Sequence, residues 1–401
     1  MTSSRDWSLV YAELIELPDP MAQAIQILET ARGIARQGVP VRVNARMLRK
    51  ADVDESLKAI LGPDLHDGLD VAPLLAKQKG LAGFQYRLRL LSALLGADSD
   101  TVFYGRSRRH TLFVLRARRR LRSKARVFYE FHNIECEVAK EDGDPEHEAR
   151  LRAEEAEVCR EADGIVSISE PMADDLKELF ELADRPTVIP DGVAARRLAR
   201  PGEEPFGQER VNVVYAGSLY AYKGVDQLFD MLDALPSNFE LTIVGGQAPE
   251  DLARLKKQAG ERASIAQRVH FTGMVAPSRI AEHLWTADLT VLPPGNSLKS
   301  SRYTSPLKLF EAMAAGVPIV AAPVPALTSV LEHGKTGWFA EDATPRGLAA
   351  IVEHAAAHRE QSRAIARAGC ALANELDWDQ RGKLVVDFIE SRPSGGTRPR
   401  A

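Results

Sequence analysis

Residues 305–323, SPLKLFEAMAAGVPIVAAP, read as a short helix that runs directly into a buried strand. Ser305 is a favourable N-cap, Pro306 suits the first helical position, and Gly316 stands where a left-handed residue closes a helix. Residues 319–322 are apolar throughout, which is typical of a strand covered on both faces. A helix followed at once by such a strand predicts an α/β sheet.

The composition indicates a chain with more than one core. Its 401 residues are 45% hydrophobic and 27% charged, with a formal net charge of −4. Because single cores stop growing at roughly 250–300 residues, we expect two domains. The three cysteines lie far apart without a CxxC spacing, which argues against a disulfide framework or a zinc site. With no secretory leader and no apolar run of the roughly 20 residues that span a bilayer, we expect a cytoplasmic protein.

Short β-branched and aromatic runs alternate along the chain with longer segments of helical periodicity. Strands separated by helices imply right-handed crossovers and parallel sheets. About a dozen strands are too many for one open sheet, so we predict an α/β fold with two Rossmann-like, doubly wound domains facing across a cleft. Ligands bind such sheets beyond the carboxyl ends of the strands. The expected strands are 9–14, 39–44, 101–104, 127–131, 164–168 and 187–189, then 211–215, 240–244, 269–271, 289–292, 318–321 and 338–339.

Three motif types that suggest other chemistries are interpreted as incidental. Residues 334–336, GKT, resemble the end of a phosphate-binding P-loop, but that loop needs a glycine where Ser329 stands. No GxGxxG follows an expected strand, which argues against a nicotinamide dehydrogenase. Asp-x-Asp triplets can hold a divalent metal, but none follows a strong strand, so we expect surface positions for those at 52/54, 98/100 and 377/379.

Six segments together resemble retaining glycosyltransferases with the GT-B fold, specifically family 4. GSLYAYKG (217–224), VHFTG (269–273) and the stretch 305–323 are similar to that family's C-terminal domain. The resemblance implies an enzyme that moves a sugar from a UDP- or GDP-linked donor to an acceptor, such as a lipid-linked or polysaccharide precursor. It implies no further cofactor and no nucleic acid partner. The segments similar to the N-terminal domain and hinge are FYEFHN (128–133), EADGIVSISE (161–170) and TVIPDGV (187–193).

The resemblance also sets the expected domain limits. Residues 1–193 are expected to form an N-terminal acceptor-side domain, and residues 211–375 the nucleotide-sugar-binding domain. The polar, Pro- and Gly-containing segment 194–210 is the predicted linker between them. A helix at about 376–391 is expected to cross back onto the N-terminal domain, leaving 392–401 as a flexible tail.

The donor diphosphate explains the charges inside the stretch 305–323. The leaving group gains negative charge as the glycosidic bond breaks, so the site must present positive charge where it develops. Lys223 follows an expected strand, and the helix at Pro306 offers its first N–H groups together with Lys308. This arrangement needs no metal. The resemblance assigns Glu311 to the ribose hydroxyls, and the residues expected at the diphosphate are Gly217, Ser218, Lys223, Ser305, Pro306, Leu307 and Lys308.

Further site residues come from the resemblance alone. Gly245, Met274 and Val275 would contact the nucleoside, with the base read mainly by backbone. His132 ends an apolar run and matches the histidine that faces the transferred sugar, where it would orient or deprotonate the acceptor. From the residues alone, a lone histidine at the end of an apolar strand is more often a hydrogen-bonded core residue than a catalyst. The expected catalytic residues are therefore His132, Lys223 and Glu311.

Three positions depart from the family pattern. Tyr303 stands where many members carry a glutamate, so the sugar contacts are expected from Arg302, Tyr303 and Thr304, partly through backbone N–H groups. Ser218 replaces the usual arginine near the phosphate lysine, and either Arg302 or Lys308 is expected to substitute for the missing charge. The glycine-rich loop expected after the first strand is replaced by ELPDP at 16–20.

Two other functions stay open at this point. An epimerase of the same architecture would act on the nucleotide-sugar with no acceptor. A catalytically degenerate member would bind a nucleotide-sugar or a partner as an assembly subunit, which the missing glutamate and arginine favour. The presence of His132, Lys223 and Glu311 argues against the degenerate member.

Residues 106–126, RSRRHTLFVLRARRRLRSKAR, form a dense basic run in an acidic chain. One interpretation is a solvated helix face. The other is a docking surface for anionic lipid headgroups or a phosphate-linked acceptor at the inner face of the membrane. RNA binding is disfavoured because the run lacks the interleaved aromatic residues of a stacking platform.

Overall fold

The computed structural model describes residues 5–18, 22–47, 52–63, 65, 68–74, 78–202, 204–246, 248–295 and 297–392. The chain divides into two compact units, one formed by Met1–Gly192 with Trp378–Ala401 and the other by Val193–Asp377. In the described ranges, no helix combines the length and the apolar character needed to cross a bilayer. Apart from Arg392, the expected tail 392–401 lies outside the described residues, as do Asp19 and Pro20.

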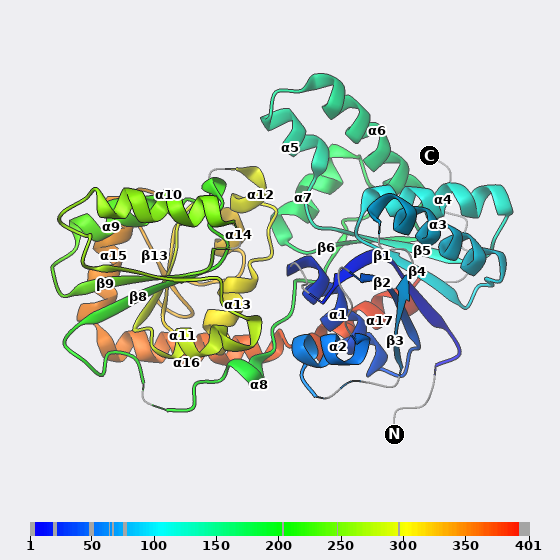
Figure 1. Cartoon of the computed structure of the whole chain (residues 1–401). Coiled ribbons are helices and arrows are strands. Elements are labelled where there is room, and N and C mark those ends of the chain that lie inside the picture. The colour runs from blue at the N-terminus through cyan, green and yellow to red at the C-terminus, as the bar shows by residue number, and fades with distance from the viewer. Residues whose placement is uncertain are drawn as a thin grey trace. The chain divides into compact units, whose positions relative to one another are not determined.

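The first unit is built on a seven-stranded parallel sheet ordered β3-β2-β1-β4-β5-β6-β7 (Figure 1). The chain starts in the middle at β1, winds outward to β3 and then returns to β4. Because crossovers are right-handed, this reversal places the helices of the two halves on opposite faces. The strands are β1 Ser8–Leu17, β2 Val41–Met47, β3 Leu69–Leu74, β4 Thr101–Gly105, β5 Arg126–Phe131, β6 Gly164–Ser167 and β7 Thr187–Val188. The helices are α1 Ala22–Ala35, α2 Val53–Leu61, α3 Lys79–Leu95, α4 Arg108–Leu121, α5 Glu135–Glu141, α6 Pro145–Glu161, α7 Glu170–Leu179 and α17 Trp378–Glu390.

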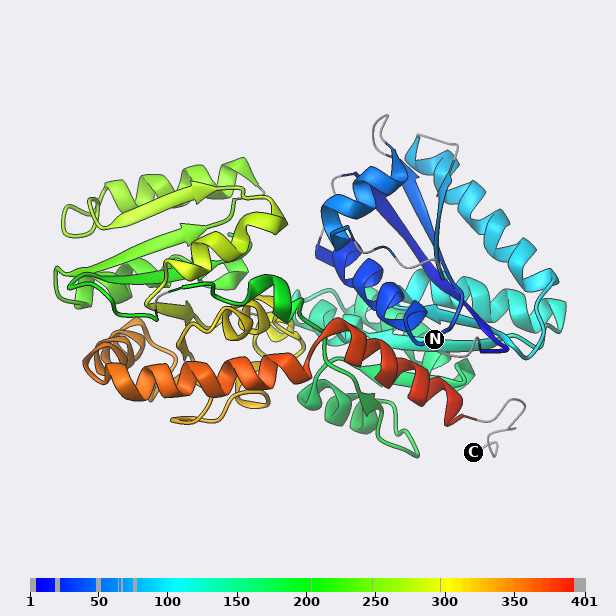
Figure 2. The same ribbon diagram turned by 90° about the horizontal axis from the view of Figure 1, so that it is seen from below.

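The last helix, α17, packs along α1 in the first unit, as the red and blue helices of Figure 2 show. Two glycines allow the close approach. A Cβ on Gly382 would lie 2.1 Å from the carbonyl carbon of Gly33, and a Cβ on Gly33 would lie 2.3 Å from the carbonyl oxygen of Trp378. The backbones therefore touch where any larger residue would force them apart.

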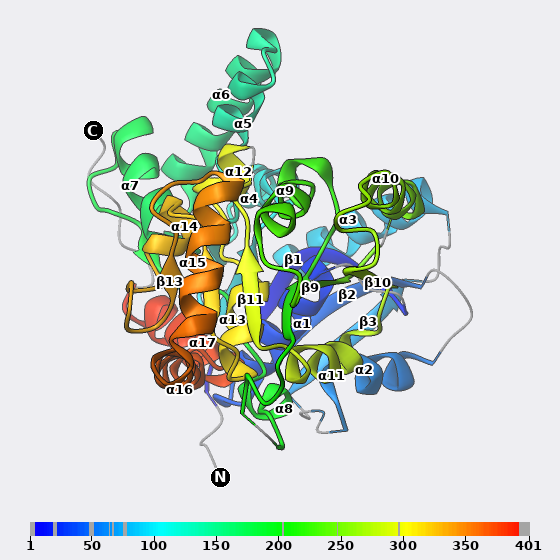
Figure 3. The same ribbon diagram turned by 90° about the vertical axis from the view of Figure 1, so that its left-hand side faces the viewer.

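The second unit contains a six-stranded parallel sheet ordered β10-β9-β8-β11-β12-β13, of which β9, β10, β11 and β13 are labelled in Figure 3. Its order reverses at β8, so the carboxyl ends of β8 and β11 flank the point where ligands bind in open α/β sheets. The strands are β8 Val211–Ala216, β9 Phe239–Val244, β10 Val269–Gly273, β11 Leu289–Leu292, β12 Ile319–Ala321 and β13 Trp338–Phe339. The helices are α8 Ala195–Leu198, η1 Ala221–Lys223, α9 Gln227–Ala234, α10 Pro249–Gly260, η2 Pro277–Arg279, α11 Ile280–Trp285, α12 Leu298–Ser301, α13 Leu307–Ala314, α14 Pro325–Thr328, α15 Pro345–Ala357 and α16 Arg359–Glu375.

The predicted α/β class with two doubly wound parallel sheets is confirmed, and each expected strand is present. The sequence analysis missed β3. This strand pairs only with β2, and its Pro73 lies opposite Ala45. An edge strand tolerates proline and polar residues that a central strand would not, so LDVAPL lacks the apolar run used to find the others.

The prediction that 194–210 forms a linker is wrong for most of that segment. Ala195 and Leu198 of α8 are buried in one apolar cluster with Leu309 and Met313. Phe206 is buried in the main core of the second unit. Segment 194–210 was predicted as a linker because most of its residues are polar. Its three buried apolar residues make it part of the second unit from α8 onward.

Gly382→Ala is expected to destabilise the protein by about 3 kcal/mol, because its Cβ would meet backbone that cannot move aside cheaply. Urea unfolding of the variant measures this loss. The matched control is Gly83→Ala in α3, where a Cβ meets nothing within 4 Å. That substitution should stabilise by about 0.5–1 kcal/mol, because alanine is the better helix former. Equal effects of the two variants would contradict the packing argument.

Candidate functional site

Gly217 and Gly245 directly follow β8 and β9, Gly273 is the last residue of β10, and these glycines pack backbone to backbone. The N–H of Gly217 donates to the Val244 carbonyl at 2.9 Å, and the N–H of Gly245 donates to the Gly273 carbonyl at 3.2 Å. A Cβ on Gly245 would lie only 2.0 Å from the carbonyl oxygen of Gly217. The edge of the sheet is therefore lined by bare backbone, which a ligand can approach closely.

Lys308 lies against the loop that begins at Gly217. A Cβ on Gly217 would lie 3.5 Å from Lys308 Cδ. The Nζ of Lys308 donates to the Tyr215 hydroxyl at 3.4 Å and lies 4.6 Å from the centre of that ring. Burial raises the pKa of Tyr215, so its hydroxyl stays protonated and donates to the Ser218 carbonyl at 2.8 Å. The structure thus brings Gly217, Ser218 and Lys308 together, with Tyr215, which the sequence analysis missed.

Lys223 and Lys308 are close enough to repel each other. Burial, and then the charge of Lys223, lower the pKa of Lys308 to about 7. Burial, and then Lys299, lower the pKa of Lys223. Burial disfavours the charged form of both lysines, so an anion between or beside the two ammonium groups would stabilise both. This makes the pair a candidate anion site.

Helix α13 begins one residue later than its sequence predicts. Pro306, not Ser305, is the N-cap, and the N–H groups of Leu309 and Phe310 donate to its carbonyl at 2.8 and 3.4 Å. Ser305, the residue before Pro306, is buried. The helix closes as predicted, with Gly316 at a φ of 65°. The first turn of α13 therefore presents both its unpaired N–H groups and Lys308 toward the N-terminal end of the helix.

Glu311 is a half-buried carboxyl on a helix whose other residues form core. Its neighbours Leu309, Phe310, Ala312 and Met313 are fully buried. Burial raises the pKa of Glu311 to about 7. It lies three residues after Lys308, and residues at this spacing are neighbours on a helix surface. One short helix therefore presents a cation and a carboxyl to the same region.

The residues predicted to contact the sugar are less well placed. The N–H groups of Arg302 and Tyr303 both donate to the Leu298 carbonyl, at 2.9 and 3.1 Å, because they close helix α12. Only 3% of Tyr303 is exposed, so its side chain belongs to the core. These two N–H groups and the Tyr303 side chain are therefore not available to a sugar, while contacts by the Arg302 side chain and by Thr304 stay predictions. Met274, by contrast, is 68% exposed after the β10 glycine.

His132 follows β5 in the first unit and hydrogen-bonds to a buried carboxylate. Its Nε2 lies 2.5 Å from Glu130 Oε1. Burial, and then the charge of Arg106, lower the pKa of His132, so the imidazole is neutral at pH 7. A neutral ring facing a carboxylate must carry its proton on Nε2, which leaves Nδ1 as the acceptor. The two interpretations of His132 are thus compatible: it is hydrogen-bonded, and 15% of its side chain is exposed.

Glu130 is held ionised by three donors. Burial by itself would raise its pKa, but Arg381, His132 and Tyr104 together hold it well below its usual range. Arg381 Nη2 and the Tyr104 hydroxyl each donate to Glu130 Oε2 at 2.5 Å. Arg381 comes from α17 and also donates to the Ile189 and Pro190 carbonyls and to the Thr30 hydroxyl. Glu130 could have been identified from the sequence as a charged residue inside the apolar run FYEFHN. No feature of the sequence around Arg381 indicated that it pairs with Glu130.

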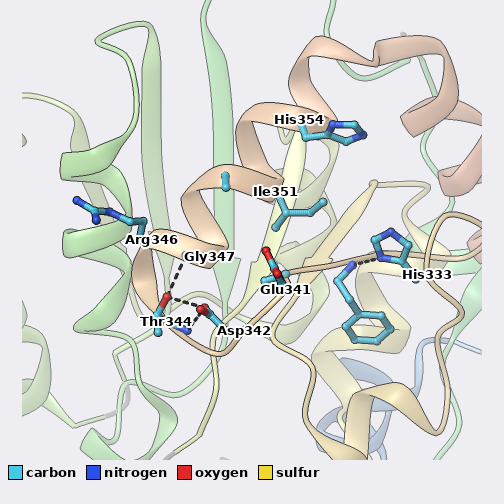
Figure 4. Close-up of a pocket in the computed structure, with 11 residues that line it drawn as sticks. His333, Glu341, Asp342, Thr344, Arg346, Gly347, Ile351 and His354 are labelled. Carbon is cyan, nitrogen blue, oxygen red and sulfur yellow. Dashed lines mark hydrogen bonds between the residues drawn. The ribbon is translucent and has the colours of Figure 1, made fainter.

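A separate hollow of about 710 Å³ lies between β13 and α15 (Figure 4). Its polar side chains serve local structure. Asp342 accepts from the Thr344 hydroxyl and N–H, and the Phe339 N–H donates to His333 Nδ1 at 3.0 Å. None of the residues predicted for a site lines this hollow, so we do not assign it a role in the chemistry.

Solved structures of the same fold are numerous. HepE from Anabaena, in complex with UDP and glucose, matches with a TM-score of 0.72 at 17% identity, covering 96% of this chain and 100% of that chain. The sucrose-phosphate synthase from Thermosynechococcus elongatus matches with a TM-score of 0.73 at 16% identity, covering 96% of this chain and 98% of that chain. These likenesses define the class: the two sheets form a GT-B fold.

Two family models then identify the family. The model described as Glycosyltransferase Family 4 matches residues 23–197, and the model described as Glycosyl transferases group 1 matches residues 210–358. The chain belongs to the group 1 glycosyltransferases. It is 27% identical over 265 residues to the D-inositol 3-phosphate glycosyltransferase of Jonesia denitrificans, which covers 61% of this chain. The matched part spans 61% of that relative's length.

Removing Arg381 is expected to cost about 3–5 kcal/mol, because Arg381→Met leaves Glu130 buried without its cation. The double variant Glu130→Gln/Arg381→Met should lose much less than the sum of the single losses. Urea unfolding at pH 7 measures both. Because the pKa of Glu130 is depressed, the stability from the ion pair is present above the ordinary pKa of about 4.3 and is lost as the pH falls. Additive losses would show that the two residues act separately.

Proposed function

We propose that this chain is a retaining, metal-independent glycosyltransferase that moves a sugar from a nucleotide-diphosphate sugar to an acceptor. The observation that carries the proposal is the set formed by Lys223, Lys308 and Glu311 beside the glycine-lined edge of the sheet. Its two cations repel each other without an anion. The donor diphosphate is the anion whose charge grows during the reaction.

The lysines and the helix start would take the place of a metal ion. As the leaving group departs, Lys223 and Lys308 would neutralise its phosphates, and the first N–H groups of α13 would donate to them. Bare backbone at Gly217 lets the phosphates approach without a side chain in the way. Charge supplied by fixed side chains requires no coordination sphere.

Glu311 would hold the ribose of the donor. An ionised carboxylate accepts from two hydroxyl groups at once, which suits the 2′ and 3′ hydroxyls of a nucleoside. Burial disfavours that ionised form in the free protein, so the ribose hydroxyls would stabilise what burial destabilises. HepE is a GT-B protein crystallised with UDP and with UDP-glucose, which supports a UDP-linked donor; a GDP-linked donor is the alternative.

In the first unit, His132 would act on the transferred sugar or the acceptor. Its Nε2 proton is engaged by Glu130, so Nδ1 would accept a hydrogen bond or a proton from a sugar hydroxyl. The acceptor proposed is a glycan or lipid-linked precursor at the cytoplasmic membrane face. An acceptor-free epimerase and a nucleotide-sugar-binding assembly subunit are the outcomes that product analysis would reveal instead.

Thermal unfolding against UDP, GDP, CDP and ADP sugars tests the donor site. A ligand at 100 times its dissociation constant should stabilise the wild type by about 2.7 kcal/mol, and Glu311→Ala should lose that protection. Glu353→Gln, an exposed change on α15, is the control and should keep it. Protection of Glu311→Ala equal to that of wild type would remove Glu311 from the site. No protection by any nucleotide would favour the assembly subunit or overturn the donor site.

Binding of the diphosphate should take up close to one proton at pH 8. Lys308, with a pKa of about 7, is then mostly neutral and becomes charged beside the phosphates. Calorimetry of UDP binding in buffers of different ionisation enthalpy measures the uptake. Lys308→Arg supplies a permanent cation, so it should bind UDP without the proton uptake. Equal uptake in both proteins would show that Lys308 does not meet the phosphates.

A further inference from the structure

Helix α3 (Lys79–Leu95) presents a row of large apolar side chains to solvent. Leu81, Phe84, Leu88 and Leu95 are 57%, 60%, 50% and 71% exposed. Spacings of three, four and seven residues place them on one face of the helix. A row of this kind on a soluble surface marks a place where something else binds.

The fold does not need this row, because α3 is attached by its opposite face. Ala82, Tyr86, Leu90 and Leu94 are at most 1% exposed. The ring of Tyr86 meets the ring of His110 on α4 edge-on, with centroids 5.1 Å apart. A surface helix normally carries charged residues where α3 carries leucine and phenylalanine.

The two neighbouring helices α3 and α4 contain no acidic residue, although the chain has 56 of them. They lie side by side in the first unit (Figure 1). Their charged side chains are all arginine or lysine. The exposed apolar row therefore sits on a purely cationic pair of helices.

Many of the α4 arginines form ion pairs within the first unit, so only part of the basic run 106–126 is a free cationic surface. These arginines connect α4 through ion pairs to carboxylates of α5, α6 and the residue Asp163. The ion pairs are Arg108 with Glu135 and Glu154, Arg116 with Glu157, Arg118 with Asp163, and Arg119 with Glu161.

Three exposed arginines instead border the apolar row. Arg109, Phe113 and Arg120 share one face of α4, since they are spaced by four and seven residues. The guanidinium of Arg87 on α3 lies over the Phe113 ring, 5.8 Å from its centre, so this face turns outward beside α3. Arg87, Arg109 and Arg120 form no ion pair with the residues that the structure describes.

We propose that the α3–α4 face docks on an anionic lipid bilayer. The row Leu81, Phe84, Leu88 and Leu95 would enter the boundary between headgroups and acyl chains, with Arg87, Arg109 and Arg120 at the level of the phosphates. Apolar side chains next to cations without acids are the pattern of an interfacial helix. This inference stands independently of the proposed enzymatic function.

A second copy of the chain is the less suitable occupant. A two-fold interface would place the same face against itself, bringing the arginines of both copies together with no carboxylate from α3 or α4 to neutralise them. An anionic bilayer supplies both the phosphates and the apolar layer that the face requires. Charge complementarity therefore selects the bilayer.

Vesicle sedimentation tests the proposal without donor or acceptor. The wild type should pellet at low salt with phosphatidylcholine vesicles that contain about 30% phosphatidylglycerol, and much less with pure phosphatidylcholine. Leu81→Gln/Phe84→Gln/Leu88→Gln should reduce binding at least about tenfold, because it removes the inserted area. Arg87→Gln/Arg109→Gln/Arg120→Gln should abolish the preference for the anionic lipid.

The matched control removes three exposed cations elsewhere, Lys58→Gln/Lys177→Gln/Arg346→Gln, and should bind like wild type. Equal binding of the wild type and the apolar variant, or no pelleting of the wild type, would overturn the proposal. So would a wild-type dimer, seen by analytical ultracentrifugation, that the apolar variant converts to a monomer. Every changed side chain is exposed, and circular dichroism verifies that the variants are folded.

Discussion

The buried ion pair between Arg381 and Glu130 is the interaction on which the first unit depends. One guanidinium from the last helix reaches β5, the hydroxyl of Thr30 on α1 and the carbonyls of Ile189 and Pro190 after β7. A buried charge is tolerated only when its hydrogen bonds are complete, so these parts of the chain must stay in register with one another. The same carboxylate fixes the tautomer of His132, which ties the C-terminal helix to the chemistry of a residue far from it in sequence.

In the second unit, by contrast, the charged groups of the candidate site are disfavoured by burial. Lys223 and Lys308 are half-buried beside the glycine-lined sheet edge. Burial lowers the pKa of both, with a further contribution from Lys299 for Lys223 and from Lys223 for Lys308. Glu311 has its pKa raised for the same reason of burial. The buried charges around Glu130 in the first unit thus have partners within that unit, while burial disfavours the charged forms of Lys223, Lys308 and Glu311 in the second. This difference is the physical basis for our proposal that the second unit binds the nucleotide.

The structure brings together Lys223, Lys308 and the Gly217 loop, which the sequence had singled out, but it differs from the expectation where backbone geometry decides. Lys308 and Glu311 stood out because a charge inside an apolar helix needs a reason. Tyr303 was assigned to a sugar by its position in a motif, but the end of α12 uses its N–H and the core takes its ring. Tyr215 was missed because a tyrosine ending a buried strand looks like ordinary core. In the basic run, the sequence could not distinguish arginines that pair with α6 from those that face solvent.

The sequence by itself determined the fold class, because the alternation of apolar strands with amphipathic helices is a local property that each segment carries alone. It also indicated which charged residues are candidates for a functional role, since the desolvation cost of a charge within an apolar segment is evident from the neighbouring residues. Only the tertiary structure decided which charges meet. Arg381 and Glu130 are separated by most of the chain, and the close crossing at Gly33 and Gly382 brings them together. Electrostatic interactions act through space within a few ångströms, so their partners are set by the packing of whole elements and not by distance along the sequence.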